Sequence, residues 1–173
     1  MADGTFAVEL VTPEETLLEA RTRAVVLRSS DGDLTVLDGH SPLITDIVPG
    51  EVRVDPAEGE PLRFAVHGGY LQVGTAGAES GDGPGGTLVT VLAGVAEAAE
   101  RIDVARAEQA RATASARVEE LRAAGRTGAG PAAGGGAEAG EHPLTPEDLE
   151  LAQAEAALRR AEVRLAVAGV TAG

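Results

Sequence analysis

Cysteine, lysine and tryptophan are absent from this chain, and aromatic residues account for only 2% of its 173 positions. The lack of cysteine excludes disulfides, thiolate metal sites and cysteine nucleophiles, and it fits a reducing compartment. The lack of lysine excludes a phosphate-loop lysine. Apolar residues still make up 43% of the chain, so we expect a core built from Val, Leu, Ile and Ala.

Positive charge is also scarce, and the formal net charge is −14. Binding to nucleic acid depends on neutralising phosphates, so this charge argues against a nucleic-acid partner. No apolar run approaches the roughly 20 residues of a membrane helix, and the first residues lack the pattern of a signal peptide. We therefore expect a cytoplasmic protein with no direct membrane insertion, able to dock on a membrane-bound partner.

Short apolar stretches broken by Gly, Pro and Asp fill residues 5–92. Apolar side chains alternate at Phe6, Val8 and Leu10, at Val52 and Val54, and at Leu62, Phe64 and Val66. This period of two predicts an antiparallel all-β domain over residues 1–93, either a β-sandwich or a barrel. The Gly-rich residues 74–86 separate two strand-like runs and are expected to form a hairpin loop.

Beyond residue 93 the period changes, and residues 94–173 are predicted to form an antiparallel two-helix hairpin. A first helix is expected over residues 95–124, ending at Gly125, with its apolar face at Ala107, Ala110, Ala114, Val118 and Leu121. Residues 125–140 contain seven glycines and are predicted to form a linker, which as a random coil spans about 20 Å.

The second helix has a distinct start signal. Thr145 is placed to cap it, Pro146 suits the first helical position, and Asp148 can return the capping bond. Leu144 and Leu149 are spaced to pack around the cap. The stripe that follows, Leu151, Ala154, Leu158, Ala161, Leu165 and Ala168, suits close packing on the first helix, although it equally fits a surface helix on the sandwich.

The sequence contains no recognisable catalytic set. Its histidines, His40, His67 and His142, lack metal-ligand spacing, and no GxxxxGK[ST] phosphate loop is present. We therefore predict no catalytic residues, no metal site and no required cofactor.

Four strings in sequence order resemble epsilon subunits of bacterial F-type ATP synthases. They are SDGDLTVLDGHSPL (30–43), VHGGYLQV (66–73), TVLA (90–93) and IDVARA (102–107). The resemblance covers the chain almost end to end, and it departs from the family at the insertion 74–86 and at the long linker 125–140. It implies a β-sandwich followed by a helical hairpin.

The resemblance also implies a role. Such a subunit is a non-catalytic part of the central stalk, or rotor, which couples proton translocation to ATP synthesis. Its sandwich contacts the gamma subunit and the c-ring, and its helices contact the alpha and beta subunits transiently and inhibit ATP hydrolysis. It would lie peripherally at the cytoplasmic face of the bacterial plasma membrane.

Contact residues follow from the same resemblance. Asp31, Asp33 and His40 are the candidates for the c-ring, at one end of the sandwich; alternatively, His40 satisfies only local backbone groups. Gly69, Tyr70 and Leu71 are the candidates for gamma, although Gly68 and Gly69 equally fit a simple β-bulge.

A regulatory ATP site is implied for some family members. The matching residues are Glu97, Ile102, Asp103, Arg106, Ala107, Arg160 and Arg164. Asp103 is also placed to cap the first helix, where Arg106 opposes the helix dipole; an ordinary surface pairing with Asp103 or Glu100 is the alternative. Arg160 and Arg164 share a helix face, where like charges repel unless an anion lies between them.

Two other functions remain open from the sequence. The chain could act as a free-standing nucleotide sensor with ATP as its main partner. It could also be an unrelated β-sandwich with a helical stalk that serves as an adaptor.

Overall fold

The computed structural model describes residues 4–75, 86–128 and 145–169. These residues fall into two compact units. The strand unit comprises Met1–Val104 together with Val163–Gly173, and the helical unit comprises Ala105–Glu162. The boundary therefore crosses one helix near its end.

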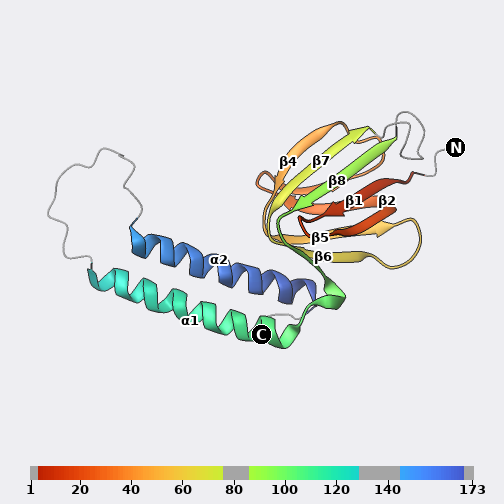
Figure 1. The fold of residues 1–173 in the computed structure, drawn as a ribbon. Coiled ribbons are helices and arrows are strands. Elements are labelled where there is room, and N and C mark those ends of the chain that lie inside the picture. Colours follow the sequence, from red (N-terminus) through yellow and green to blue (C-terminus); the bar gives the residue numbers. More distant parts are fainter. Residues whose placement is uncertain (1–3, 76–85, 129–144, 170–173) are drawn as a thin grey trace, which may run out of the picture. The chain divides into compact units, whose positions relative to one another are not determined.

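In its described residues, the strand unit is a β-sandwich with nine strands (Figure 1). They are β1 (Phe6–Val11), β2 (Thr16–Ser29), β3 (Gly32–Val36), β4 (Leu43–Ile47), β5 (Gly50–Pro56), β6 (Leu62–Val66), β7 (Gly69–Thr75), β8 (Thr87–Ala93) and β9 (Ala96–Ala98). Their order is β4-β7-β8-β1-β2-β5-β6-β9, with β3 paired to β2. The predicted fold class, a sandwich followed by two helices, is confirmed.

The long strand β2 connects the two layers. Its first half pairs with β1, and its second half pairs with β3 and β5, with a register shift between Thr22 and Ala24. The hydroxyl of Thr22 is buried there, lies within hydrogen-bond distance of the carbonyl oxygens of Ala24 and Asp55, and accepts from the amide of Ala24. A hydrogen-bonded hydroxyl satisfies the backbone groups that such an irregularity frees.

The sandwich core contains the residues that the alternating pattern predicted. Phe6, Val8 and Leu10 are buried on β1, as are Val52 and Val54 on β5 and Phe64 and Val66 on β6. The predicted hairpin of β7 and β8 is also present, with antiparallel pairing from Gly69–Ala93 to Thr75–Thr87. The inserted residues 76–85 lie outside the described part.

Helix α1 covers Val104–Gly128 and α2 covers Pro146–Val167, and they run antiparallel in the helical unit (Figure 1). The first helix starts later than predicted, because residues 96–98 pair with β6 as β9 and residues 99–101 form a short 3-10 helix. Gly125 does not end it, so that prediction is wrong. Of the predicted linker, residues 125–128 belong to α1, and residues 129–140 lie outside the described part.

The helix seam is made of small side chains. Ala107, Ala114 and Val118 on α1 are buried, as are Ala154 and Ala161 on α2, whereas Ala110 is exposed. At its start, α2 has the predicted cap: Thr145 N donates to Asp148 Oδ2 at 2.9 Å, and Asp148 N donates to Thr145 Oγ1 at 3.1 Å. Within the described residues, neither helix is long and apolar enough to cross a membrane.

Candidate functional site

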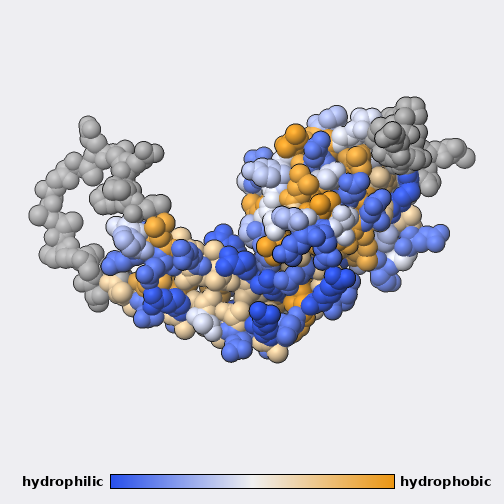
Figure 2. Space-filling model, viewed as in Figure 1, coloured by the Kyte–Doolittle hydropathy of each residue, from blue (hydrophilic) through white to orange (hydrophobic). Residues whose placement is uncertain are grey.

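An apolar patch lies on the outer face of β4, β7 and β8. Ile44, Tyr70 and Leu92 remain 72%, 61% and 46% exposed. Tyr70 lies directly opposite Leu92, and Ile44 lies opposite Gln72, two residues from Tyr70, so all three share one face. We call these three residues the sheet patch. Figure 2 shows hydrophobic residues on the visible surface of the strand unit.

The alternation that exposes Tyr70 buries its neighbour. Leu71 is completely buried and packs in the sandwich core, since successive strand residues face opposite sides. Its side chain therefore does not belong to a contact surface, which corrects the prediction for that residue. Ile44 and Leu92 were missed, although Leu92 lies within the alternating string TVLA and Ile44 directly follows HSPL.

Gly69 supplies backbone geometry at the start of β7. Its φ is +153°, and a Cβ atom there would overlap the carbonyl oxygen of Leu92 and lie 3.0 Å from the Ala93 Cα. The preceding Gly68 has a φ of +107°, and its carbonyl accepts a hydrogen bond from Gly94. The two glycines thus allow β7 to approach β8 closely at the start of β7. Tyr70 is the next residue on that strand.

The residues predicted to contact the c-ring do not form one surface. Asp31 and Asp33 lie at the start of β3, whereas His40 follows its end, so the strand separates them. His40 lies beside local backbone, with its Nδ1 2.8 Å from the Ser41 carbonyl oxygen. This corrects the expectation that all three lie at one end of the sandwich.

The turn before β3, which contains Ser30 and Asp31, is hydrogen-bonded to Asp46 of β4. Ser30 Oγ donates to Asp46 Oδ1 at 2.7 Å, and this hydrogen bond lowers the pKa of Asp46 from its ordinary value of 3.8. Asp33 lies 3.7 Å from the Arg28 guanidinium, and both side chains are largely exposed. The turn therefore presents charged groups to solvent with only weak internal compensation.

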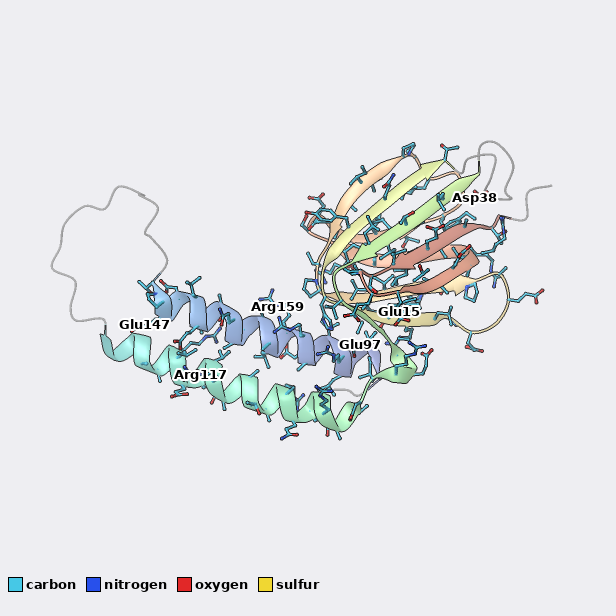
Figure 3. The ribbon with its side chains drawn as sticks, viewed as in Figure 1. Glu15, Asp38, Glu97, Arg117, Glu147 and Arg159 are labelled. Carbon is cyan, nitrogen blue, oxygen red and sulfur yellow. The ribbon has the colours of Figure 1, made fainter. Side chains whose placement is uncertain are left out.

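Glu97 on β9 binds Arg164 near the end of α2. Arg164 Nη2 donates to Oε1 at 2.6 Å, and Nε donates to Oε2 at 3.0 Å, a bidentate arrangement (Glu97 is labelled in Figure 3). Both side chains are partly buried. The anion beside Arg164 in this structure is thus a carboxylate of the chain itself.

The other residues of the predicted nucleotide set divide between the units. Ile102 and Asp103 belong to the strand unit, where Ile102 is buried and Asp103 directly precedes α1 in the capping position. Arg106, Ala107 and Arg160 belong to the helical unit. Ala107 is buried in the helix seam, whereas the two arginines are exposed.

An open groove of about 490 Å³ runs along the helix pair. Its lining residues include Arg106 and Arg117, together with Ala110, Ala114 and Ala154. Arg117, labelled in Figure 3, binds Glu120 and Glu150 at 2.8 and 2.7 Å, and the bond to Glu120 is the main cause of its raised pKa. In the described part of the chain, no cluster of three or more acidic or histidine residues could hold a metal ion.

Comparisons with a family model and with curated relatives point to the same protein family. The beta-sandwich domain described as "ATP synthase, Delta/Epsilon chain" matches residues 5–79. The ATP synthase epsilon chain of Moorella thermoacetica is 35% identical over 94% of this chain and 95% of its own length. That of Symbiobacterium thermophilum is 34% identical over 98% and 95%.

A solved structure has the same fold. A chain in the mitochondrial ATP synthase of Euglena gracilis, in an assembly of OSCP, F1 and c-ring, superposes with a TM-score of 0.65 at 20% identity. The match covers 94% of this chain and 81% of that one.

Proposed function

This chain belongs to the family of ATP synthase epsilon chains, and from that premise we propose that it is a rotor subunit that couples proton translocation to ATP synthesis. It is a non-catalytic subunit, so in this proposal its role is to transmit rotation between other subunits. In this proposal the sandwich connects the gamma subunit to the c-ring at the cytoplasmic face of the bacterial plasma membrane.

The sheet patch carries the proposal of gamma binding. Three large apolar side chains on adjacent strands stay in water at 46–72% exposure, while Leu71 and Val91, next to Tyr70 and Leu92, are buried. Contiguous exposed apolar surface is costly for a protein without a partner and marks an interaction site. Burial of each side chain contributes about 1 to 3 kcal/mol. A partner that covers all three would therefore gain specific affinity.

The sheet patch can be tested with a matched control. We expect Tyr70→Ser to weaken binding to the gamma subunit of the same synthase roughly tenfold, measured by calorimetry, because about 1.4 kcal/mol of apolar burial is lost. Leu37→Ser is the control, since Leu37 is 53% exposed but lies outside the sheet patch. Equal affinities for both variants would refute this assignment.

For the c-ring we propose contact through the exposed acids Asp31, in the turn before β3, and Asp33, in the first part of β3. Pairs between exposed charges contribute about 0 to 1 kcal/mol each, so they set orientation more than affinity. Charge reversal of Asp31 and Asp33 should impair proton-driven ATP synthesis in reconstituted vesicles while gamma binding stays normal. Unchanged coupling would exclude this contact.

We also propose that α1 and α2 regulate ATP hydrolysis through transient contact with the alpha and beta subunits. Two slender helices, with the Gly-rich sequence 129–140 between them, support this proposal. The test is hydrolysis by the purified complex with and without residues beyond Asp103, a truncation that keeps β9 in the sheet. Inhibition that persists without the helices would place it elsewhere, and normal coupling in a synthase lacking the whole chain would remove the rotor assignment.

ATP is proposed as a regulatory ligand of the helices. Support comes from the string IDVARA and from Arg160 and Arg164, four residues apart on α2. Because Arg164 already binds Glu97, a phosphate at this arginine has to compete with that carboxylate. We expect Arg160→Ala to weaken ATP binding in calorimetry; unchanged binding would contradict the assignment.

A further inference from the structure

A β-bulge in β2 turns two neighbouring residues toward the same side of the sheet. Thr22 and Val25 are both fully buried, although strict alternation would expose one of them. Because Thr22 and Ala24 pair with successive residues of β5, Arg23 between them is the extra residue of the bulge. Arg23 and Ala24 therefore both lie on the outer face, and bulges often re-aim a side chain in this way beside a functional site.

An open pocket of about 470 Å³ lies beside this bulge, and we call it the bulge pocket. Its apolar lining comes from Ala24, Leu37, Pro56 and Pro61. Leu37 directly follows β3 and leaves more than half of its surface in contact with water. A concave site with an exposed apolar wall is suited to hold an apolar group of a ligand.

Two arginines and one carboxylate line the rest of the bulge pocket. Arg53 Nε lies 3.0 Å from Asp55 Oδ1, and Arg53 Nη2 donates to Asp55 Oδ2 at 3.2 Å. Arg23 Nε donates to the Pro56 carbonyl oxygen at 3.2 Å, its one hydrogen bond among the residues that the structure describes. Asp55 thus neutralises one guanidinium, whereas both Nη groups of the other can still donate. This local positive charge, in a chain of net charge −14, favours an oxyanion.

We propose that the bulge pocket binds a carboxylate that is attached to a branched apolar group. The carboxylate accepts hydrogen bonds from the Nη groups of Arg23, in the planar geometry that guanidinium and carboxylate share. The apolar group packs against Leu37 and Pro61. Two sources carry this chemistry, a free branched-chain carboxylic acid and the C-terminal residue of a peptide. The site does not depend on the proposed function.

An NMR titration of the full chain tests the site with small probes. Isovalerate represents the free acid, and N-acetyl-leucine represents the peptide chain end. We expect saturable shifts of the Arg23 Nε–H resonance, with a dissociation constant on the order of 1 mM for ligands this small. The acid that binds more tightly identifies the source. N-acetyl-leucinamide lacks the charge and inorganic phosphate lacks the apolar group, so each should bind roughly tenfold more weakly than that acid.

Variants of the chain identify the residues that bind. Arg23→Gln should weaken binding of the tighter acid roughly tenfold, followed at the Ala24 amide, because charged hydrogen bonds are lost. Arg28→Gln is the matched control: it makes the same change on the same strand, where Arg28 pairs with Asp33 outside the bulge pocket. Leu37→Ser should weaken binding roughly fivefold, because the apolar wall is lost.

The absence of a shift with both acids would overturn the proposal. Equally tight binding of N-acetyl-leucinamide or inorganic phosphate would overturn it too, as would equal affinities of Arg23→Gln and Arg28→Gln. If Arg23→Gln also shifts the amides of β1, Leu37→Ser replaces it, and unchanged affinity in that variant would overturn the proposal. No other synthase subunit is present in these titrations, so a failure to bind gamma would leave their result standing.

Discussion

Gly69→Ala is the substitution whose effect the structure specifies most closely. The new methyl group would overlap the Leu92 carbonyl oxygen in a strand pair whose register begins at Gly69 and Ala93. The backbone at φ +153° is also one that a side chain rarely adopts. Relief of the overlap requires β7 to move away from β8, which disturbs the pairing of β4 with β7 on its other side.

The expected cost combines two terms. Holding alanine in a rare backbone region costs about 1 to 3 kcal/mol, and forcing extra volume into packed structure costs about 1 to 3 kcal/mol. Their sum, roughly 4 kcal/mol, is a large part of the 5 to 15 kcal/mol typical of a whole domain. With an m-value near 2 kcal/mol/M, the urea midpoint should fall by about 2 M.

The assay can use a natural probe. Tyr70 is the only tyrosine and the chain has no tryptophan, so tyrosine fluorescence reports on the sandwich directly. Gly74→Ala is the control, because a Cβ atom at Gly74 meets nothing within 4 Å and φ there is unexceptional. If the two variants unfold at the same urea concentration, the close approach of β7 and β8 does not require glycine and the reasoning is wrong.

Further substitutions test the helix cap, the acidic turn and the helix packing. Thr145→Ala should destabilise α2 by about 1 kcal/mol, seen as lost helical circular dichroism on heating, because its hydroxyl no longer caps the Asp148 amide; an unchanged transition would contradict the cap. Ser30→Ala should raise the pKa of Asp46 toward 3.8 in a carboxyl NMR titration. Since the folded pKa is the lower one, the bond stabilises above pH 3.8 and its contribution disappears as pH falls through the folded value; an unshifted titration would exclude it. Leu165→Ala, at a fully packed position, should lower the free energy of unfolding by about 2 to 5 kcal/mol in urea, and a loss below about 1 kcal/mol would show that the site is not packed.

The features predicted well are those governed by local rules. Alternation along a strand placed Phe6 and Val8 in the core, because period two assigns each side chain to a face. The cap at Thr145 is formed by residues three positions apart, so the sequence holds all of its parts. Even the exposed position of Tyr70 follows from alternation once its strand is known.

The errors arose where distant segments decide the outcome. Residues 96–98 have a helix-forming composition, yet pairing with β6 holds them as a strand. The predicted stripe of α2 omitted Val167, which packs with Ala65 of β6 and with Ile102. Val163 and Val167, four apart on a second face, were the available signal. No local sequence pattern indicated that Glu97 would form an ion pair with Arg164.

The parallel pairing of β1 with β8 has a consequence for biosynthesis. Val8 lies beside Val89, so β1 gains this neighbouring strand only after nearly all of the sandwich has been synthesised. Closure is therefore a late, non-local event of the slow kind. Until residue 93 has emerged, the unpaired edge of β1 is open to wrong partners, which makes this strand the point where a nascent chain most needs protection from aggregation.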